Sequence, residues 1–367
     1  MDNFRVWRSL GRYNWCVMER AVYRIIDANF NRAREALRVM EEFCRFGLNS
    51  SALTGRTKQL RHELAAEITK FDSARLIACR DTLGDVGVNK IVENQLGRES
   101  LNDCFTAACK RLPEALRVLA EVTQTINPAQ SRSIENLRYT AYTLEKDIVV
   151  FAAPAEKFRK VRLYVIISSN VAADVMSLTK QCIAGGADCI QLRAKAIDDD
   201  KLFALAAGLT QLCAEGDVLS IINDRVDIAI AAEADGVHLG QNDLPVEHAR
   251  RLQMSPLIIG KSTHSPAQLR LACSEQPTYI GLGPVFSTGT KPTTPPVGLD
   301  YVRQGVKLVS DTGIGHVAIG GITLDNVSEV LRAGGRSVAV CSAVTQAPDP
   351  ASVCQKLKEK LALVNNE

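Results

Sequence analysis

Eight short apolar runs alternate with segments of helical spacing in the second part of the chain. Parallel strands that are buried on both faces are continuously apolar rather than alternating, and these runs have that character. Eight such strands, each followed by a helix within roughly 200 residues, predict a TIM (β/α)8 barrel over residues 161–367. The runs are VRLYVII, DCIQLR, VLSIIN, DGVHL, LIIGKS, TYIGLG, HVAIGG and SVAVCS.

Polar residues and glycines follow the runs, where each strand is expected to end. The carboxyl ends of barrel strands meet at one mouth, which carries the active site. Arg193 and Lys195 share one face of an extended segment and can point at one anion. Asp224 and Asp243 follow neighbouring strands and suit Mg²⁺ bridged to a diphosphate. Further polar or small residues at this mouth are Asn223, Ser262, Thr288, Thr290, Lys291, Gly321, Cys341 and Ser342.

Two more features of this mouth bear on its chemistry. The segment GLGPVFSTGTKPTTPPVG is dense in Gly, Pro and Thr, and it predicts either a loop that closes over substrate or a plain surface loop. Glycines at the end of the seventh run, with helix amino termini after the last two runs, predict a phosphate site built from backbone N–H groups. His238 lies within a run and is interpreted as a packing residue.

The first 150 residues have helical spacing and contain a repeat. AREALRVMEE at 33–42 is echoed by LPEALRVLAE at 112–121, which predicts two related helices in an all-α domain over residues 1–150. The shared E-x-x-R-x-x-x-E pattern indicates either salt-bridged helix faces or the wall of a pocket for an anionic substrate. Asp27 or Asn29 is the expected helix cap. One apolar stripe is expected from Ala33, Ala36, Leu37, Met40, Phe43 and Cys44.

The loop CRDTLGDVG at 79–87 separates the two repeats. Its residue types suit a phosphate with Mg²⁺, and they suit an ordinary turn equally well. Further along, Pro154 interrupts the helical periodicity, which predicts a linker over residues 151–160.

Composition excludes several classes of protein. The net charge is +3, without a tract of clustered Lys and Arg, so a nucleic-acid partner is not expected. The sequence contains no run of about 18 apolar residues, so a membrane span is not expected. The eleven cysteines are scattered, which is typical of reduced thiols in a cytoplasmic protein. Small-molecule substrates are therefore the expected partners, and a homo-oligomer stays open.

The motifs QLRAK, INDR, GVHLGQND, GKSTH, YIGLGPVFSTGTK, AIGGI and VAVCSA occur in this order, and residues 161 to about 362 resemble the thiamine phosphate synthase family. The resemblance implies a Mg²⁺-dependent transferase that couples hydroxymethylpyrimidine diphosphate with hydroxyethylthiazole phosphate and releases pyrophosphate. It implies that Arg193, Lys195 and Lys291 stabilise the leaving group. Where Cys341 stands, the family often has a larger aliphatic residue.

The same resemblance assigns ligands to the matching positions. Asp224 and Asp243 are implied to hold Mg²⁺. The thiazole phosphate is implied to contact Gly321, Cys341 and Ser342. The pyrimidine diphosphate is implied to contact Gln191, Arg193, Lys195, Asn223, Ser262 and Lys291, with Thr288 and Thr290 nearby.

The segments DANFNRAREALRVMEE and RDTLGDVG, with the second EALRV, resemble the small single-function hydroxymethylpyrimidine-phosphate kinase family over about residues 22–148. This implies a second activity that uses ATP as co-substrate. A regulatory or dimerisation module is the alternative for this domain, and a thiazole tautomerase is the alternative for the barrel. The kinase-site candidates in the matching motifs are Asp27, Asn29, Arg34, Arg38, Asp81 and Asp85.

Overall fold

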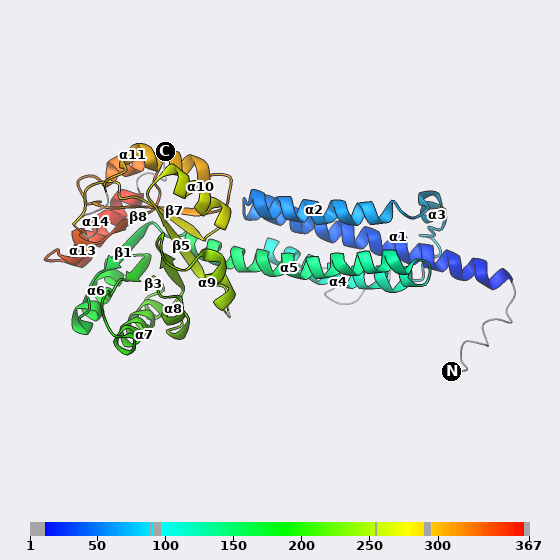
Figure 1. Ribbon diagram of the computed structural model, residues 1–367, viewed down its shortest axis with the longest axis horizontal. Coiled ribbons are helices and arrows are strands. Elements are labelled where there is room, and N and C mark those ends of the chain that lie inside the picture. The colour runs from blue at the N-terminus through cyan, green and yellow to red at the C-terminus, as the bar shows by residue number, and fades with distance from the viewer. Residues whose placement is uncertain (1–11, 88–89, 91–96, 254, 290–294, 363–367) are drawn as a thin grey trace. The chain divides into compact units, whose positions relative to one another are not determined.

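Long helices form the first part of the chain in the computed structural model, which describes residues 12–87, 90, 97–253, 255–289 and 295–362 (Figure 1). The chain separates into two compact units, Met1–Ile148 and Val149–Glu367. The helical elements are α1 (Arg12–Glu42), the π-helical turn η2 (Phe43–Gly47), α2 (Ser51–Ile68), α3 (Ser73–Ala78), α4 (Leu101–Gln124) and α5 (Pro128–Arg159).

Helices α1 and α4, which carry the two repeats, pack against each other. The predicted apolar stripe is confirmed, because all six of its members are buried, four in α1 and two, Phe43 and Cys44, in η2. Leu116 and Leu119 of the second repeat are buried as well, and Phe43 stacks on Phe105 with ring centroids 4.3 Å apart. The repeated sequence therefore supplies the two apolar faces of the helical core.

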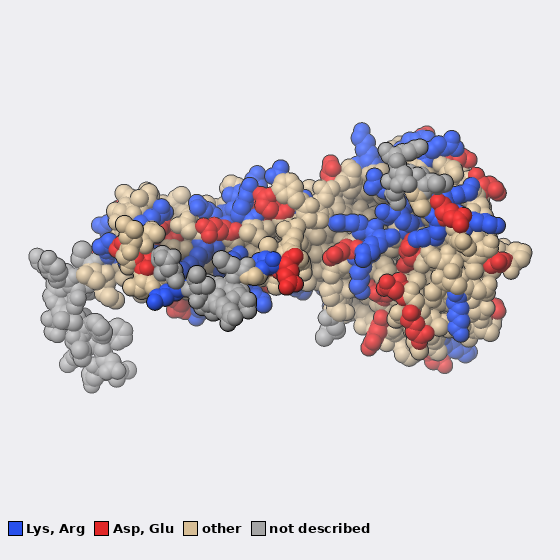
Figure 2. Space-filling model, turned by 180° about the vertical axis from the view of Figure 1, so that it is seen from behind, with Lys and Arg blue, Asp and Glu red and all other residues tan. Residues whose placement is uncertain are grey.

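The charged residues of the E-x-x-R-x-x-x-E pattern lie outside the helical core, whereas Glu41 beside them is buried. Arg38 pairs with Glu42 at 2.9 Å, and Arg117 pairs with Glu121 at 2.5 Å, both with i,i+4 spacing. Figure 2 shows acidic and basic side chains mixed along the helical unit on the face that it draws. For these residues the structure supports the interpretation as salt-bridged helix faces rather than a pocket wall.

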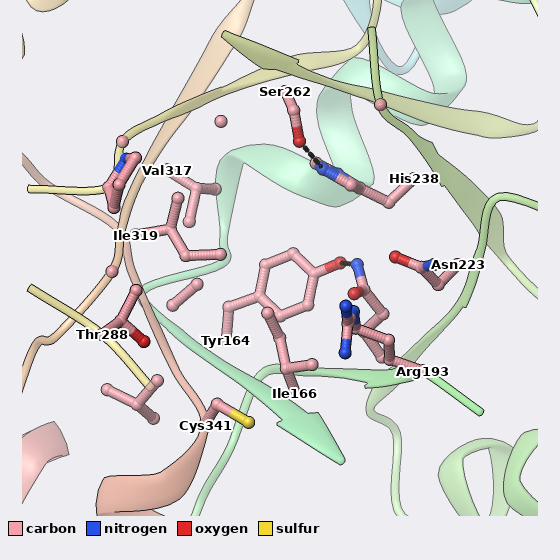
Figure 3. A pocket seen from close by; sticks show the side chains of 18 of the residues that line it. Tyr164, Ile166, Arg193, Asn223, His238, Ser262, Thr288, Val317, Ile319 and Cys341 are labelled. Carbon is pink, nitrogen blue, oxygen red and sulfur yellow. Dashed lines mark hydrogen bonds between the residues drawn. The ribbon is translucent and has the colours of Figure 1, made fainter. Parts of the chain in front are cut away.

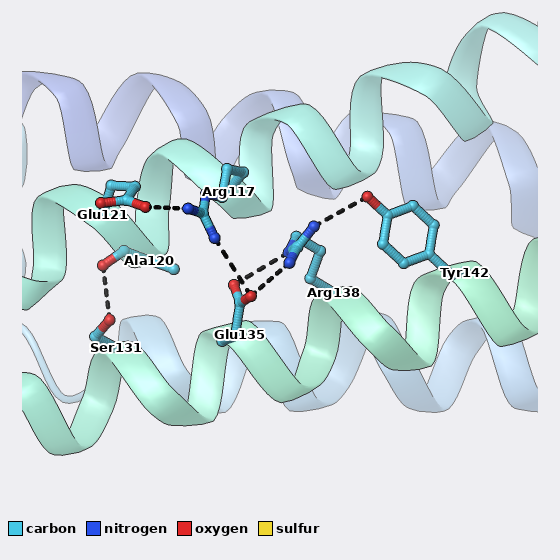
Figure 4. A network of polar contacts seen from close by, with 7 residues as sticks. All are labelled: Arg117, Ala120, Glu121, Ser131, Glu135, Arg138 and Tyr142. Carbon is cyan, nitrogen blue, oxygen red and sulfur yellow. Dashed lines mark hydrogen bonds and ion pairs between the residues drawn. The ribbon is translucent and has the colours of Figure 1, made fainter.

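An ion-pair network joins α4 to α5 (Figure 4). Glu135 of α5 accepts hydrogen bonds from Arg138 on its own helix and from Arg117 on α4. Arg138 also donates to the hydroxyl of Tyr142 at 3.0 Å. The two guanidinium groups lower the pKa of Glu135, with the hydrogen bond from Arg138 as the largest cause. The network orients the two helices at their exposed seam.

Two local predictions in the helices are wrong. Helix α1 begins at Arg12, so Asp27 and Asn29 lie in its interior and do not cap it. Helix α5 continues through Pro154 to Arg159, so the expected interruption at residues 151–160 is absent. A proline inside a helix costs one backbone hydrogen bond. The burial of Phe151 and Phe158 beside it offsets that cost.

The second unit is a closed barrel of eight parallel strands in the order β1 to β8, as the sequence predicts. All eight apolar runs form strands: β1 (Leu163–Ile167), β2 (Cys189–Leu192), β3 (Leu219–Asn223), β4 (Gly236–Leu239), β5 (Ile258–Thr263), β6 (Tyr279–Leu282), β7 (Gly315–Ile319) and β8 (Val338–Val340). The helices are α6 (Ala172–Ala184), α7 (Asp199–Glu215), α8 (Val226–Ala231), α9 (Val246–Leu252), α10 (Pro266–Glu275), α11 (Gly298–Val309), α12 (Val327–Arg332), α13 (Ser342–Thr345) and α14 (Pro350–Ala362).

The end of α5 contributes to the barrel interior. Phe158 stacks on Tyr279 with ring centroids 4.0 Å apart and an interplanar angle of 4°. Both belong to an interior cluster with Tyr164 and Ile166 of β1. This packing fills the barrel from the amino-terminal ends of the strands. Among the described residues, no helix is long and apolar enough to cross a membrane.

Candidate active site

A cavity of about 640 Å³ opens at the carboxyl ends of the barrel strands (Figure 3). The structure brings most of the predicted barrel residues to it. Those that line the cavity are Gln191, Arg193, Lys195, Asn223, Asp224, Asp243, Ser262, Thr288, Gly321, Cys341 and Ser342. The predicted residues Thr290 and Lys291 lie outside the described part of the chain.

The loop after β6 lies against the end of β7 and carries Thr288 into the cavity wall. The N–H of Val285 donates to the carbonyl of Ile319 at 2.8 Å, and that of Phe286 donates to Gly320 at 3.0 Å. Gly321 has a positive φ of 63°, and a Cβ there would come 2.4 Å from the Ser287 carbonyl oxygen. Glycine is therefore required for this close approach.

Two carboxylates and one ammonium converge on the side of the cavity formed by β3 and β4. Lys195 Nζ lies 3.3 Å from Asp224 Oδ2. Burial raises the pKa of Asp224, and the neighbouring carboxylate of Asp243 raises it further, while Lys195 lowers it. Asp224 also has a left-handed backbone with φ of 64°, which is uncommon outside glycine and is found at functional sites.

The two neighbouring carboxylates have the chemistry that a divalent cation requires of its ligands. Mg²⁺ takes one or two carboxylates and completes its shell with water and phosphate oxygens. No group of three or more His, Cys, Asp or Glu ligands occurs in the described residues, so a site enclosed by side chains alone is not built there. A cation held by Asp224 and Asp243 would relieve the repulsion that raises the pKa of Asp224.

The backbone under Asp243 is held by a buried lysine. Lys261 of β5, which is 6% exposed, donates from Nζ to the Gly240 carbonyl at 2.8 Å. The N–H of Gly240 donates to Asp243 Oδ2 at 2.6 Å. Gln241 donates to the Ser262 carbonyl, also at 2.6 Å. These contacts fix the loop that presents the second carboxylate.

The cavity floor is lined by three side chains that have no predicted role in the site: Tyr164, Tyr279 and His238. His238 packs in the barrel as predicted, but both of its ring nitrogens also contact hydroxyl groups, those of Tyr279 at 2.9 Å and Ser262 at 2.8 Å. A tyrosine inside a buried strand needs a partner for its hydroxyl. That requirement was the signal available in VRLYVII and TYIGLG.

In the helical unit, the candidates Asp27 and Asp81 lie in one region. Arg80 forms a two-point contact with Asp27, at 2.7 and 2.8 Å. Arg24 of α1 donates to the Asp81 carbonyl at 3.2 Å. The Asp81 side chain accepts from the Gly84 N–H, and Asp85 likewise accepts from Gly87. The 79–87 loop is thus a pair of carboxylate-stabilised turns that is attached to α1.

The other three candidates lie apart from this loop or make local contacts. Arg38 is 11 residues from Asp27 on the same helix, or roughly 16 Å along the axis at the α-helical rise. It pairs with the buried Glu41 and with Glu42. Asn29 donates to the Ile25 carbonyl one turn earlier, and the guanidinium of Arg34 lies over the Phe30 ring at 5.6 Å.

Comparison with known families matches both parts of the chain. Residues 163–344 match the family model described as thiamine monophosphate synthase. Residues 24–147 match the model of the ThiD2 family.

Individual relatives cover nearly the whole chain. A thiamine-phosphate synthase of Nostoc punctiforme is 39% identical over 95% of this chain and 97% of its own. A protein of the same name from Rhodopirellula baltica is 40% identical over 89% of this chain and 88% of its own. Among solved structures, the thiamine phosphate pyrophosphorylase of Pyrococcus furiosus is 36% identical, covers 56% of this chain and 97% of its own, and has a TM-score of 0.52.

Proposed function

The chain belongs to the thiamine-phosphate synthases, transferases of thiamine biosynthesis, and we propose that its barrel joins hydroxymethylpyrimidine diphosphate to hydroxyethylthiazole phosphate. The observation that carries this proposal is the cavity at the strand ends, where cations, two carboxylates and a glycine-bordered loop line one space. Such a mouth suits two phosphorylated substrates better than one small neutral molecule.

The proposed reaction breaks one bond and forms another. The bond from the pyrimidine methylene carbon to the pyrophosphate oxygen breaks, and pyrophosphate takes the electron pair. The ring amino group stabilises the resulting cation, and the lone pair of the thiazole nitrogen forms the new carbon–nitrogen bond. The nucleophile is a neutral nitrogen, so the step needs no general base. It needs stabilisation of negative charge on the leaving group.

The side chains of the cavity are suited to that task. Arg193 and Lys195 present a guanidinium and an ammonium at the end of β2, and Lys291 is proposed to add a second ammonium. Asp224 and Asp243 would hold Mg²⁺, which supplies charge neutralisation at the diphosphate when it is bound. Asn223 is proposed to position the pyrimidine diphosphate, with Thr288 and Thr290 nearby.

The thiazole phosphate is assigned to the opposite part of the cavity. Gly321 follows β7, and Cys341 and Ser342 follow β8; all three line the cavity. This site is proposed to depend on backbone groups, so the small Cys341 side chain is compatible with it. Asn326 donates to the Gly321 carbonyl at 2.8 Å, which fixes the turn that carries the proposed contact.

For the helical unit, the match to the ThiD2 family over residues 24–147 supports a second proposed activity. This is ATP-dependent phosphorylation of hydroxymethylpyrimidine phosphate to the diphosphate that the barrel consumes. The region of Asp27, Arg80 and Asp81 is the proposed location, because a guanidinium and loop carboxylates there are suited to phosphate and Mg²⁺. The exposed ion pairs of Arg38 and Arg117 instead favour the alternative of a structural or regulatory unit.

One reaction distinguishes these readings. The full chain is given hydroxymethylpyrimidine phosphate, thiazole phosphate and Mg²⁺, with or without ATP, and thiamine phosphate is quantified. Product that requires ATP supports both activities in one chain. Product that forms only from supplied pyrimidine diphosphate supports the synthase and a non-catalytic helical unit. No product under either condition would contradict the proposed synthase reaction.

A further inference from the structure

Five side chains form a hydrogen-bond chain across the inside of the barrel, below the cavity. It runs from Gln191 on β2 through Tyr164, Tyr279 and His238 to Ser262 on β5. Figure 3 shows its last contact, between His238 and Ser262. The four contacts measure 2.8, 2.9, 2.9 and 2.8 Å in that order. Gln191, Tyr164 and Tyr279 are each no more than 2% exposed, so water has little access to interrupt the chain at that end.

The first contact of the hydrogen-bond chain has a defined direction. The amide nitrogen of Gln191 donates to the Tyr164 hydroxyl oxygen, so the carbonyl oxygen of the same amide is left for the cavity that Gln191 lines. Burial raises the pKa of both tyrosines well above the usual value. Both therefore keep their protons, and each hydroxyl has one hydrogen to donate.

The remaining hydrogens can be arranged in two orders, because a hydroxyl oxygen can accept two hydrogen bonds. In one order Tyr164 donates to Tyr279, and Tyr279 donates to His238 Nδ1. A neutral imidazole has one donor and one acceptor nitrogen, so with Nδ1 accepting, Nε2 carries the hydrogen and donates to the Ser262 hydroxyl oxygen. The hydroxyl hydrogen of Ser262 then remains for the cavity.

We propose that Tyr164, Tyr279 and His238 are positioning residues that hold Gln191 as an acceptor and Ser262 as a donor at the cavity wall, which selects a 4-aminopyrimidine over its 4-oxo analogue. The amino form offers an N–H donor and ring-nitrogen acceptors, which complement the two ends of the chain. The oxo analogue places a carbonyl oxygen where the amino donor stands. That oxygen would face the Gln191 oxygen and leave both acceptors unpaired.

This inference rests on the proposed synthase function only for the identity of the ligand. The proton arrangement is a property of the protein and can be measured without turnover. Nitrogen-15 NMR of the full chain with labelled histidine should show His238 hydrogenated at Nε2 and unprotonated at Nδ1. A His238→Gln sample identifies the signal among the five histidines. A His238 that carries its hydrogen at Nδ1 alone would overturn the proposal.

Selectivity is tested with Tyr279→Phe and Tyr164→Phe, which remove one hydroxyl each and keep the ring. In Tyr279→Phe the stack on Phe158 is retained. The ratio of kcat/KM for the aminopyrimidine diphosphate to that for its 4-oxo analogue should fall by about 10-fold in each variant, mainly through a higher KM for the amino substrate.

Tyr301→Phe is the matched control. Tyr301 is also a buried tyrosine of the barrel unit, but its hydroxyl contacts Thr263 and Ser265, which are not part of the hydrogen-bond chain. Its selectivity ratio should equal that of the wild type. An unchanged ratio in Tyr279→Phe and Tyr164→Phe would also overturn the proposal. If the wild type itself formed no thiamine phosphate, that result would instead count against the proposed function.

Discussion

At the scale of single residues, the barrel site contains a carboxylate, that of Asp224, whose backbone conformation, burial and charged neighbour are each energetically unfavourable. Asp224 combines a left-handed backbone, partial burial and a neighbouring carboxylate, each of which costs free energy in the absence of a ligand. Such an arrangement persists where the surrounding structure enforces it. The short β3 strand and the Asp224 N–H bond to the His238 carbonyl, at 2.8 Å, do so here.

Asp224→Ala should abolish synthase turnover even at saturating substrates, because the variant loses one of two carboxylates proposed to hold Mg²⁺. A loss on the order of 100-fold or more in kcat is expected, comparable to the removal of one electrostatic contact from a transition state. The measurement is the initial rate as a function of Mg²⁺ concentration, and EDTA should inactivate the wild type in the same assay.

Asp227→Ala is the control for this prediction. Asp227 lies three residues further along, and its carboxylate pairs with Arg225 on the exposed surface. Its turnover should stay close to that of the wild type. A near-normal rate for Asp224→Ala at an ordinary Mg²⁺ concentration would show that Asp224 does not hold the metal.

The His316→Gln variant should lose less of its free energy of unfolding in mild acid than the wild type does. Burial, followed by the positive charge of Arg336, lowers the pKa of His316 to about 4, whereas an unfolded histidine titrates near 6.5. The folded state therefore binds fewer protons than the unfolded state in this pH range. The stability that His316 contributes is fully present above pH 6.5 and is lost as the pH falls toward 4. Between pH 7.5 and 4.5 the wild type should lose on the order of 2 kcal/mol more than the variant.

Urea denaturation of both proteins at the two pH values measures this difference. His248→Gln, at an exposed position on α9, controls for the substitution itself. Equal acid sensitivity of the wild type and His316→Gln would show that His316 does not contribute to this pH dependence.

At the scale of elements, α5 shows that packing outweighs local propensity. Pro154 removes one backbone donor, and the helix nevertheless continues because its last turns carry Phe151 and Phe158 into apolar surroundings. Helical stability in proteins comes mainly from such packing. Helix α1 likewise begins at Arg12, ahead of the caps that the sequence offered at Asp27 or Asn29.

Phe158→Ala should therefore destabilise the barrel by about 3–5 kcal/mol, because it removes a buried aromatic ring and leaves a cavity beside Tyr279. Denaturant unfolding of the full chain, followed by circular dichroism, measures the change. Glu156→Ala, at an exposed position on the same helix, should have little effect. A change below about 1 kcal/mol for Phe158→Ala would mean that the end of α5 is not part of the barrel core.

At the scale of the whole molecule, the chain joins two units that match two different families. The described residues that line the barrel cavity belong to the second unit. The helical unit has its own apolar core and its own ion-pair network. If both proposed activities are present, each is expected to depend on side chains of its own unit.

Arg80→Ala should abolish ATP-dependent formation of the pyrimidine diphosphate and leave the coupling of supplied diphosphate unchanged, because Arg80 supplies the guanidinium of the proposed kinase site. The two activities are assayed separately on the full chain, with ADP release as the kinase readout. Arg56→Ala is the matched control, because Arg56 is a comparably exposed arginine of the same unit that pairs with Asp147 instead. Unchanged kinase turnover in Arg80→Ala would leave Arg80 with only its contact to Asp27.

The sequence by itself determined the eight strands, their order and the residues at their carboxyl ends. These features are local, since buried parallel strands are continuously apolar and each polar residue follows its own strand directly. The apolar stripe of α1 was readable for the same reason, because its period repeats within one helix. Seven motifs in a fixed order then sufficed to indicate the family.

Only the tertiary structure decided which distant side chains meet. The contact between Tyr164 and Tyr279 joins residues 115 positions apart, and that between Arg80 and Asp27 joins residues 53 apart. Such contacts depend on closure of the barrel and on the packing of one helix against another, which no local pattern encodes. The same holds for the charged faces of the repeats, since helical spacing specifies a face but not whether a partner helix or solvent covers it.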